Sequence, residues 1–214
     1  MNLKRLPAFL AFCVTAMAAV TGASADPIEV VGFGDSLMAG YQLEAADAFP
    51  VRLEAALRER GHAVEIANAG VSGDTTSAGL SRLDWSVPDG TDGVILELGA
   101  NDALRGIAPQ RTEENLDAIL TRLSERGIPV LFVGMIAPPN MGGGYGEKFN
   151  GVFERLAEKH DVAFYPFFLD GVAAESSLNL ADGMHPNAEG VAVMVERILP
   201  TVEDWLATLK NEES

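Results

Sequence analysis

Ser36 lies where an apolar, strand-like run ends, in the stretch VVGFGDSLMAGY that spans residues 30–41. A serine hydroxyl is a weak nucleophile unless a nearby base accepts its proton, and histidine is the usual base in proteins. The chain contains three histidines. His62 and His160 occur in charged segments at a turn and at a helix end, where solvated surface histidines are expected. His185 is therefore the candidate base.

His185 belongs to the polar segment ADGMHPN, residues 181–187, just before the last predicted helix. Asp182 precedes it by three residues. In a turn, this spacing lets the carboxylate hold Nδ1–H while Nε2 faces Ser36. As an alternative, Asp182 and His185 only cap the last helix, although Asn187 is already a preferred N-cap residue. A metal site is a third interpretation, but one histidine and scattered aspartates do not provide three ligands at a recognised spacing.

Three possible donors to the oxyanion of an acyl-transfer intermediate follow three different predicted strands. They are the backbone N–H groups of Ser36 and Gly73 and the side-chain amide of Asn101. Glycine allows close approach of the backbone to a ligand, and an amide donates without ionising. Each segment also has a simpler explanation as a turn or a helix cap. Their combination with a late Asp-x-x-His favours a catalytic site.

The elements that must position these residues alternate along the chain. Apolar runs predict strands at residues 28–33, 63–67, 94–98, 129–135 and 162–165. Amphipathic patterns predict helices at 48–60, 75–85, 110–126, 147–160 and 187–209, with a bend expected at Pro200. Continuously apolar strands between helices predict an α/β fold with a parallel sheet covered on both faces. The loops after the strands then meet at one edge of that sheet.

Four segments in this order resemble the four sequence blocks of the GDSL, or SGNH, hydrolases. They are GDSL at 34–37, SGDT at 72–75, GAND at 99–102 and DGMHP at 182–186. The stretches SGDTT, ELGANDALRG and FYPFF resemble the bacterial periplasmic branch described as arylesterase, acyl-CoA thioesterase and lysophospholipase. The resemblance covers nearly the whole chain after residue 25. It implies a flavodoxin-like, three-layer α/β/α sandwich with a five-stranded parallel sheet.

The same resemblance implies roles for individual residues. Ser36 would be the nucleophile, His185 the base and Asp182 its orienting carboxylate. Ser36, Gly73 and Asn101 would surround the oxyanion. The resemblance implies neither a cofactor nor a metal. The sequence thus predicts a serine hydrolase that cleaves acyl esters or thioesters through an acyl-enzyme. The alternatives are a non-catalytic glycan- or lipid-binding module on the same fold and a polysaccharide O-deacetylase.

The segment after the fourth strand offers apolar contacts for an acyl group. The candidates are Met135, Ile136, Met141 and Tyr145, and residues 103–108 are expected to cover one side. Residues 141–146 are richer in glycine than in the related enzymes. We expect a small-molecule ester or thioester as the partner, and the sequence does not define an oligomeric state.

Two acidic residues near the predicted strand ends have no assigned chemistry. Asp35 is expected to bond neighbouring loop amides and hold the turn. Glu97, unusual in an apolar strand, is expected to bond loop amides or an arginine such as Arg82 or Arg105.

The first 25 residues have the three-part pattern of a secretory signal peptide. Lys4 and Arg5 precede an apolar run, and the small residues 23–25 follow it. The run is short for a membrane anchor and is interrupted by Pro7. We expect removal of residues 1–25, a single domain over 26–214, and a periplasmic or secreted location. Cys13, the single cysteine, would leave with the leader. The net charge of -16 disfavours nucleic acid and anionic membranes as partners.

Overall fold

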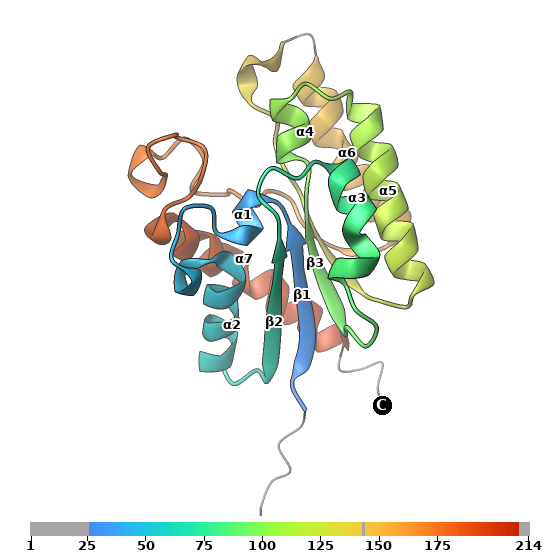
Figure 1. Cartoon of the computed structure of the whole chain (residues 1–214), viewed down its shortest axis with the longest axis vertical. Coiled ribbons are helices and arrows are strands. Elements are labelled where there is room, and N and C mark those ends of the chain that lie inside the picture. Colours follow the sequence, from blue (N-terminus) through green and yellow to red (C-terminus); the bar gives the residue numbers. More distant parts are fainter. Residues whose placement is uncertain (1–25, 143, 210–214) are drawn as a thin grey trace, which may run out of the picture.

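The computed structural model of the chain describes residues 26–142 and 144–209, and the predicted signal peptide lies outside these ranges. Five parallel strands form one sheet in the order β2-β1-β3-β4-β5 (Figure 1). The strands are β1 Ile28–Gly34, β2 Val64–Gly70, β3 Gly93–Glu97, β4 Val130–Val133 and β5 Ala163–Tyr165. All five lie at or within three residues of the ranges predicted from the apolar runs.

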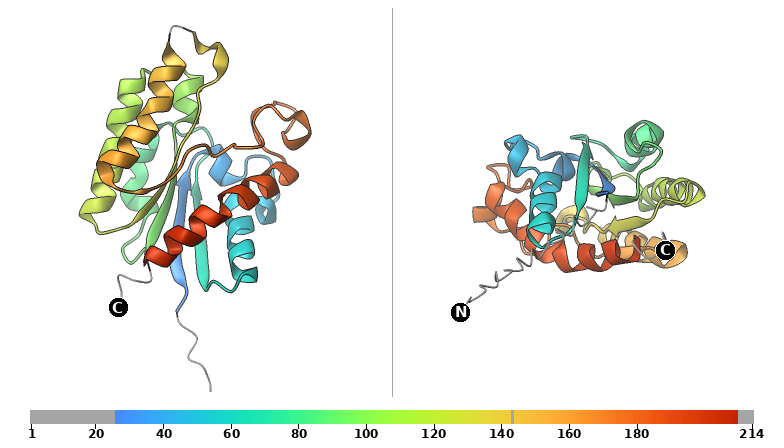
Figure 2. Two further views of the ribbon diagram at one scale, coloured as in Figure 1. Left: turned by 180° about the vertical axis from the view of Figure 1, so that it is seen from behind. Right: turned by 90° about the horizontal axis from the view of Figure 1, so that it is seen from below.

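Helices cover both faces of the sheet (Figures 1 and 2). Helices α2 and α7 pack on one face, and α3, α5 and α6 on the other. The helices are α1 Ser36–Ala39, α2 Phe49–Glu59, α3 Thr76–Ser86, α4 Ala100–Leu104, α5 Pro109–Glu125, α6 Tyr145–His160 and α7 Ala188–Leu209. Short 3₁₀ turns occur at Ala45–Asp47, Pro139–Met141 and Ser176–Leu178. The predicted three-layer α/β/α fold is confirmed.

The strand order places the predicted chemical groups at one edge of the sheet. β1 pairs with β2 on one side and with β3 on the other, so the order reverses between β1 and β3. Ligands of open α/β sheets bind outside the carboxyl ends of the strands at such a reversal. Phe33, fully buried near the end of β1, aligns with both Ala69 and Leu96, which brings the loops after all three strands to the same level.

Two helices were not expected. Helices α1 and α4 are short, and no periodic pattern predicted them. The final helix runs on through Pro200 to Leu209, in agreement with the predicted range 187–209. Both halves of α7 bury apolar residues against the same core, including Ile198 before the proline and Trp205 after it. Burial of such side chains contributes about 1.5–3 kcal/mol each, which offsets one lost helical hydrogen bond.

In the described part of the chain, we find no helix with the length and apolar character that crossing a membrane would require.

Candidate active site

Ser36 is presented by a sharp transition from β1 to α1. Asp35 is the N-cap of α1, and its Oδ1 accepts a hydrogen bond from the Leu37 backbone N–H at 3.0 Å. Ser36 is the first helical residue, where a backbone N–H has no intrahelical acceptor. Gly40 ends the short helix in the left-handed conformation. Ser36, the candidate nucleophile, is only 8% exposed and is therefore nearly buried at this edge of the sheet.

The loop before α7 carries the second half of the site and stands beside α1 (orange in Figure 1). Asp182 Oδ1 accepts from the backbone N–H groups of Met184 at 2.9 Å and His185 at 3.0 Å, which closes a turn. The base of the loop is held by a hydrogen bond from the Leu180 N–H to the His185 carbonyl at 2.7 Å and by an isolated bridge between Asn179 and Pro186. Asn187 caps the helix by accepting from Gly190, as its position predicted.

The two halves meet through the imidazole. His185 Nδ1 lies 2.7 Å from Asp182 Oδ2, and Nε2 lies 2.9 Å from Ser36 Oγ. The structure therefore brings together the serine, histidine and aspartate that the sequence singled out. This order of contacts lets the carboxylate hold the ring while Nε2 is free to accept the serine proton.

The pKa of Asp182 is lowered to about 2, chiefly by the hydrogen bonds from the Met184 and His185 backbone amides and then by the one from the His185 ring. Hydrogen bonds to a charged carboxylate favour its ionised form. Asp182 is thus an anion across the pH range in which a histidine changes its charge. An anion at this place keeps a proton on Nδ1 and leaves Nε2 as the acceptor.

Asn101 and Gly73 lie at the same edge on neighbouring elements. Asn101 is in the first turn of α4, and its Nδ2 donates to Asp35 Oδ2 at 3.0 Å. Gly99 directly before this helix has φ of 124°, a conformation that favours glycine. Arg105, just after α4, donates to the Gly73 carbonyl at 2.7 Å and so ties the loop after β2 to α4. An amide has two N–H groups, so Asn101 keeps one for a ligand.

Asp102, next to Asn101, fixes helix α4 to the neighbouring helices. Its buried carboxylate accepts from the backbone N–H and hydroxyl of Thr76, and from the hydroxyl of Thr112. Asn115 donates to the Thr76 hydroxyl. The contacts join α3, α4 and α5, so α4 is held in place by its neighbours as well as by its own backbone hydrogen bonds. Sequence reasoning did not identify this cluster, because its partners come from three separate elements.

The expectations for the two remaining acidic residues are met through backbone amides. The Asp35 carboxylate accepts from the Leu37 backbone N–H and so holds the turn, and Glu97 Oε2 accepts from the Asp35 backbone N–H at 3.2 Å. Of the two kinds of partner expected for Glu97, a loop amide or an arginine, the described residues provide the amide. Arg82 instead binds Asp74 and the Gly34 carbonyl and stacks over the Phe33 ring.

The other two histidines contact carboxylates away from the site. His62 contacts Glu203 at 3.1 Å, and His160 contacts Asp117 at 2.6 Å. Their side chains are 25% and 12% exposed, so they are less solvated than we expected. Within residues 26–142 and 144–209, no cluster of three or more histidine, cysteine or acidic residues could hold a metal ion.

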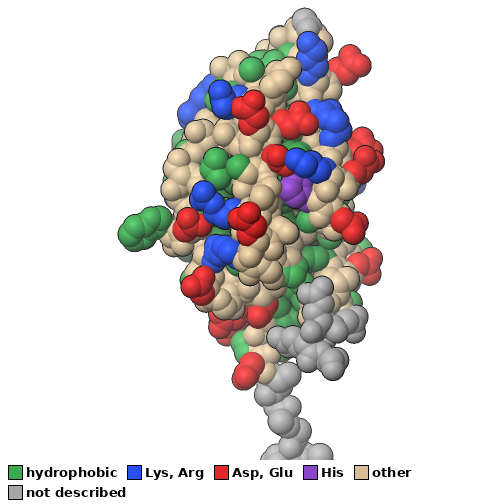
Figure 3. Space-filling model, turned by 90° about the vertical axis from the view of Figure 1, so that its right-hand side faces the viewer, with side chains coloured by type: hydrophobic (Ala, Val, Ile, Leu, Met, Phe, Trp, Pro, Cys, Tyr) green, Lys and Arg blue, Asp and Glu red, His purple; other side chains and the backbone are tan. Residues whose placement is uncertain are grey.

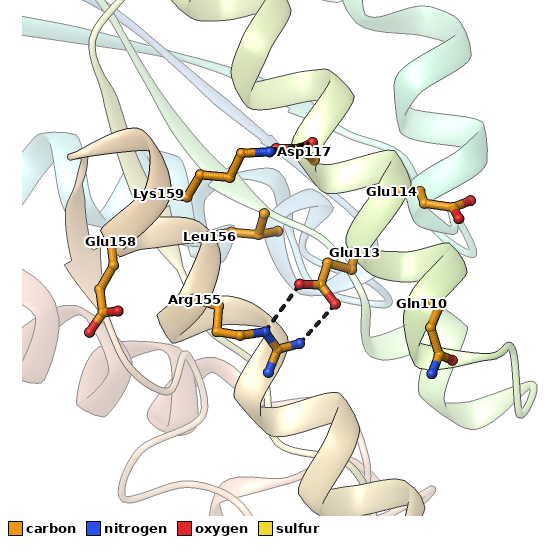
Figure 4. Close-up of a pocket in the computed structure, with 8 residues that line it drawn as sticks. All are labelled: Gln110, Glu113, Glu114, Asp117, Arg155, Leu156, Glu158 and Lys159. Atoms are coloured by element: carbon orange, nitrogen blue, oxygen red, sulfur yellow. Dashed lines mark hydrogen bonds and ion pairs between the residues drawn. The ribbon is translucent and has the colours of Figure 1, made fainter.

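A separate groove runs between α5 and α6. Figure 3 shows basic and acidic side chains intermixed on this side of the molecule. In Figure 4, Arg155 reaches across the groove to Glu113, and Lys159 reaches to Asp117. The lining residues are Gln110, Glu113, Glu114, Asp117, Arg155, Leu156, Glu158 and Lys159. Two ion pairs, Arg155 with Glu113 and Lys159 with Asp117, span the groove. The lining includes no serine, threonine or cysteine, so this groove does not resemble the Ser36 site.

Apolar side chains surround the Ser36 edge. The large exposed ones at this edge are Tyr41, Val71, Leu104, Ile136 and Met184. The Tyr41 ring lies 4.4 Å from the His185 ring, centroid to centroid. Sequence reasoning named only Ile136 among them. The other four could have been found from their place in the sequence, because each lies within five positions of Ser36, Gly73, Asn101 or His185.

The other three residues predicted to contact an acyl group are less accessible. Met135 is only 4% exposed. Tyr145 donates its hydroxyl to the Ile107 carbonyl at 2.7 Å and stacks on Phe149. Met141 lies close to Gly106. Met141 and Tyr145 thus fasten the segment after β4 to the connection between α4 and α5.

Comparisons with known proteins agree with this arrangement. A model of the GDSL-like Lipase/Acylhydrolase family matches residues 33–193. An arylesterase of Vibrio mimicus is 37% identical over 99% of this chain and 97% of its own length. Thioesterase 1/protease 1/lysophospholipase L1 of Escherichia coli K12 is 33% identical over 92% of this chain and 89% of its own. The crystal structure of AlinE4, an SGNH-hydrolase family esterase, is 44% identical with a TM-score of 0.72, covering 85% of this chain and 98% of that one.

Proposed function

The chain belongs to the GDSL-like Lipase/Acylhydrolase family, and from this premise we propose that it is a serine carboxylic-ester hydrolase that forms an acyl-enzyme. The observation that carries the proposal is the 2.9 Å contact between His185 Nε2 and Ser36 Oγ, with Asp182 on the opposite ring nitrogen. A serine, its base and an orienting carboxylate in hydrogen-bond reach are what nucleophilic catalysis requires. A binding module on this fold would have no need of that alignment.

The reaction proceeds in two steps. Ser36 Oγ attacks the acyl carbonyl carbon while its proton moves to His185 Nε2. The tetrahedral oxyanion accepts hydrogen bonds from the Ser36 and Gly73 backbone N–H groups and from Asn101 Nδ2. His185 then protonates the leaving alcohol or thiol as its bond to the acyl carbon breaks. Water, deprotonated by His185, attacks the acyl-enzyme, and collapse of this second intermediate releases the acid and restores the Ser36 hydroxyl.

The substrate is an ester or thioester with an apolar acyl or leaving group. The exposed apolar side chains at the Ser36 edge support this choice, because they provide contact surface beside the reacting atoms. Tyr41, over the His185 ring, flanks the path of the leaving group. The names of the relatives, arylesterase and thioesterase 1/protease 1/lysophospholipase L1, cover aryl esters, thioesters and lysophospholipids.

A fluorophosphonate probe tests the proposal, since covalent reaction requires an activated serine. We expect a single adduct, located on the Ser36 peptide by mass spectrometry. The labelled protein should lose hydrolysis of a series of p-nitrophenyl esters, an acyl-CoA and a lysophospholipid in parallel. An unlabelled native protein that binds lipid or glycan without turnover would favour the binding-module alternative.

Replacement of Asn101 by alanine should lower kcat by about a hundredfold or more, with a smaller change in KM. The reason is that the amide stabilises charge that develops only in the transition state. Initial-rate measurements on p-nitrophenyl butyrate would give both constants. Asn140→Ala, at an exposed asparagine of the 3₁₀ turn Pro139–Met141, is the matched control and should retain kcat. An Asn101→Ala enzyme with unchanged kcat would exclude this role.

We also propose that the chain is exported and that residues 1–25 are removed. The support is the basic start, the apolar run and the small residues before Asp26. Intact-mass analysis of protein from the periplasm or culture medium should give a chain that begins at Asp26. Recovery only of the full-length chain from the cytoplasm would contradict export.

A further inference from the structure

Two carboxyl groups are buried directly beneath the nucleophile. Asp35, at the end of β1, and Glu97, at the end of β3, are both 0% exposed. The Asp35 backbone N–H donates to Glu97 Oε2 at 3.2 Å. Gly34 makes this close approach possible, because a Cβ at that position would lie 2.6 Å from the same oxygen. Neither carboxyl takes part in the proton transfers between Ser36, His185 and the substrate, so the pair requires a separate explanation.

The hydrogen bonds indicate which of the two groups is ionised. Both oxygens of Asp35 accept N–H donors, Oδ1 from Leu37 and Oδ2 from Asn101. Glu97 Oε2 accepts one donor, whereas Glu97 Oε1 is buried with no partner among the described residues. An ionised carboxylate can only accept hydrogen bonds, so an ionised Glu97 would leave Oε1 unsatisfied at a high cost. A protonated Glu97 becomes a donor, and the Asp35 carboxylate is its neighbour.

The pKa shifts of the two carboxyl groups lead to the same assignment as the hydrogen bonds. Burial, followed by the charge of Asp35, holds the pKa of Glu97 well above its usual value. Burial also raises the pKa of Asp35, but hydrogen bonds from Leu37 and Asn101 and the nearby His185 oppose this effect, and its pKa is about 6. Two neighbouring carboxylates cannot both ionise easily. At neutral pH, Asp35 is therefore the anion and Glu97 the neutral acid.

We propose that Glu97 is a positioning residue that stays protonated at neutral pH and, through a hydrogen bond to the Asp35 carboxylate, orients Asn101 and the Ser36 turn for catalysis. The inference rests on the proposed function, because the role of Asn101 at the oxyanion belongs to it. Glu97 acts on the site through Asp35. The first step is the hydrogen bond from Glu97 to the Asp35 carboxylate, and the second is the pair of hydrogen bonds that this carboxylate accepts from the Leu37 amide and the Asn101 side chain. The proton remains on Glu97 throughout turnover.

The charged groups around the pair come from three elements. His185 approaches from the loop before α7 and lowers the pKa of Asp35. Arg82, on α3, donates to the Gly34 carbonyl at 2.8 Å and pairs with Asp74 at 2.6 Å, so part of its charge is neutralised there. Loss of the Glu97 proton would add a second negative charge below the groups that stabilise an oxyanion. Such a charge raises the energy of the anionic transition state.

The protonation state can be observed without any assay of activity. Protein with ¹³C-labelled glutamate carboxyls should show one carboxyl resonance that keeps the protonated chemical shift at neutral pH and is absent from Glu97→Gln. The native state then binds a proton that the unfolded chain releases, so stability falls as pH rises above the ordinary glutamate pKa. Asp35 contributes to the same loss of stability only up to its own pKa of about 6. The further loss of stability above that pH comes from Glu97, and Glu97→Gln should remove it. If every glutamate carboxyl titrates in the ordinary acid range, the proposal is overturned.

Kinetics test the positioning role with two variants. Glutamine imitates a neutral acid, accepting from the Asp35 amide and donating to its carboxylate, so Glu97→Gln should keep kcat within about threefold. We expect kcat of the native enzyme to fall at alkaline pH as Glu97 ionises, and Glu97→Gln should abolish this fall. Glu97→Ala should lower kcat by about tenfold or more with little change in KM. A Glu97→Gln enzyme as impaired as Glu97→Ala, or with an unchanged alkaline fall, would refute the proposal.

Failure of this inference is distinguishable from failure of the proposed function. Fluorophosphonate labelling of Ser36 reports whether the serine is activated, whatever the state of Glu97. Native protein that is labelled and turns over esters, but whose Glu97 is ionised at neutral pH, would retain the esterase proposal and overturn only this one.

Discussion

Replacement of Ser36 by alanine is expected to lower kcat by about three powers of ten or more, to the limit set by binding and the remaining oxyanion donors. In the proposed mechanism, the Ser36 hydroxyl supplies the electron pair that attacks the acyl carbon, and alanine has no group that could replace it. The fold should persist, because alanine is tolerated at the start of a helix and the backbone N–H of this position is unchanged. Steady-state rates on p-nitrophenyl butyrate, together with thermal unfolding, would separate the two effects.

Ser72 provides a matched control for this variant. It lies beside Gly73 at the same edge of the sheet, but it is exposed and makes no side-chain hydrogen bond within the described residues. Ser72→Ala should therefore keep kcat near that of the native enzyme. The nucleophile assignment fails if purified Ser36→Ala protein hydrolyses the ester as fast as its parent.

Replacement of Asp182 by asparagine should lower kcat by about three to four powers of ten. The asparagine Oδ1 can still accept from the Met184 and His185 backbone amides, so the turn should survive. An amide N–H would then face His185 Nδ1, where Oδ2 now lies 2.7 Å away. This donor favours the tautomer that carries its proton on Nε2. That nitrogen could no longer accept the serine proton.

The same steady-state assay measures the loss, and Asp170→Asn is the control. Asp170 is also at the surface and also contacts a basic side chain, Arg197, at 2.7 Å, but it lies outside the site. We expect this control to retain kcat within about twofold. A comparable loss in both variants, or a fall of less than about tenfold in Asp182→Asn, would remove Asp182 from the orienting role.

Asp182 also has a predictable effect on stability at acid pH. Its pKa in the folded protein is about 2, below the ordinary value of 3.8, so the unfolded chain binds this proton first. The stabilising contribution is present above the unfolded pKa and is lost as pH falls through the folded one. The difference in unfolding free energy between native protein and Asp182→Asn should thus shrink between about pH 4 and pH 2. Denaturant unfolding at several pH values would measure it, and a difference independent of pH would contradict the shift.

Local patterns in the sequence predicted the sheet and its long helices. The stripe formed by Leu116, Ile119, Leu120 and Leu123 is buried in α5, and the apolar runs became buried strands. Side-chain periodicity reports burial directly, because a helix or strand buries one face or both. The parallel-sheet rule then placed Ser36, Gly73 and Asn101 at one edge, and the Asp-x-x-His spacing allowed the turn that holds His185.

Short helices and long-range pairs were beyond this reasoning. Helix α4 has only five residues, too few for a periodic signal, and it is anchored by contacts from Asp102 to Thr76 and Thr112. The Tyr41 ring against His185 and the Asp35–Glu97 pair depend on how distant loops and strands pack.

The amino-acid sequence by itself determined the α/β class, the edge at which the polar groups gather, and the identities of the serine, histidine and aspartate. Only the tertiary structure decided the distances among them, the apolar surface beside them and the burial of Glu97 under the nucleophile. The physical reason is that residue type and spacing constrain local conformation, whereas contact distances, burial and pKa shifts depend on neighbours that the packed fold supplies.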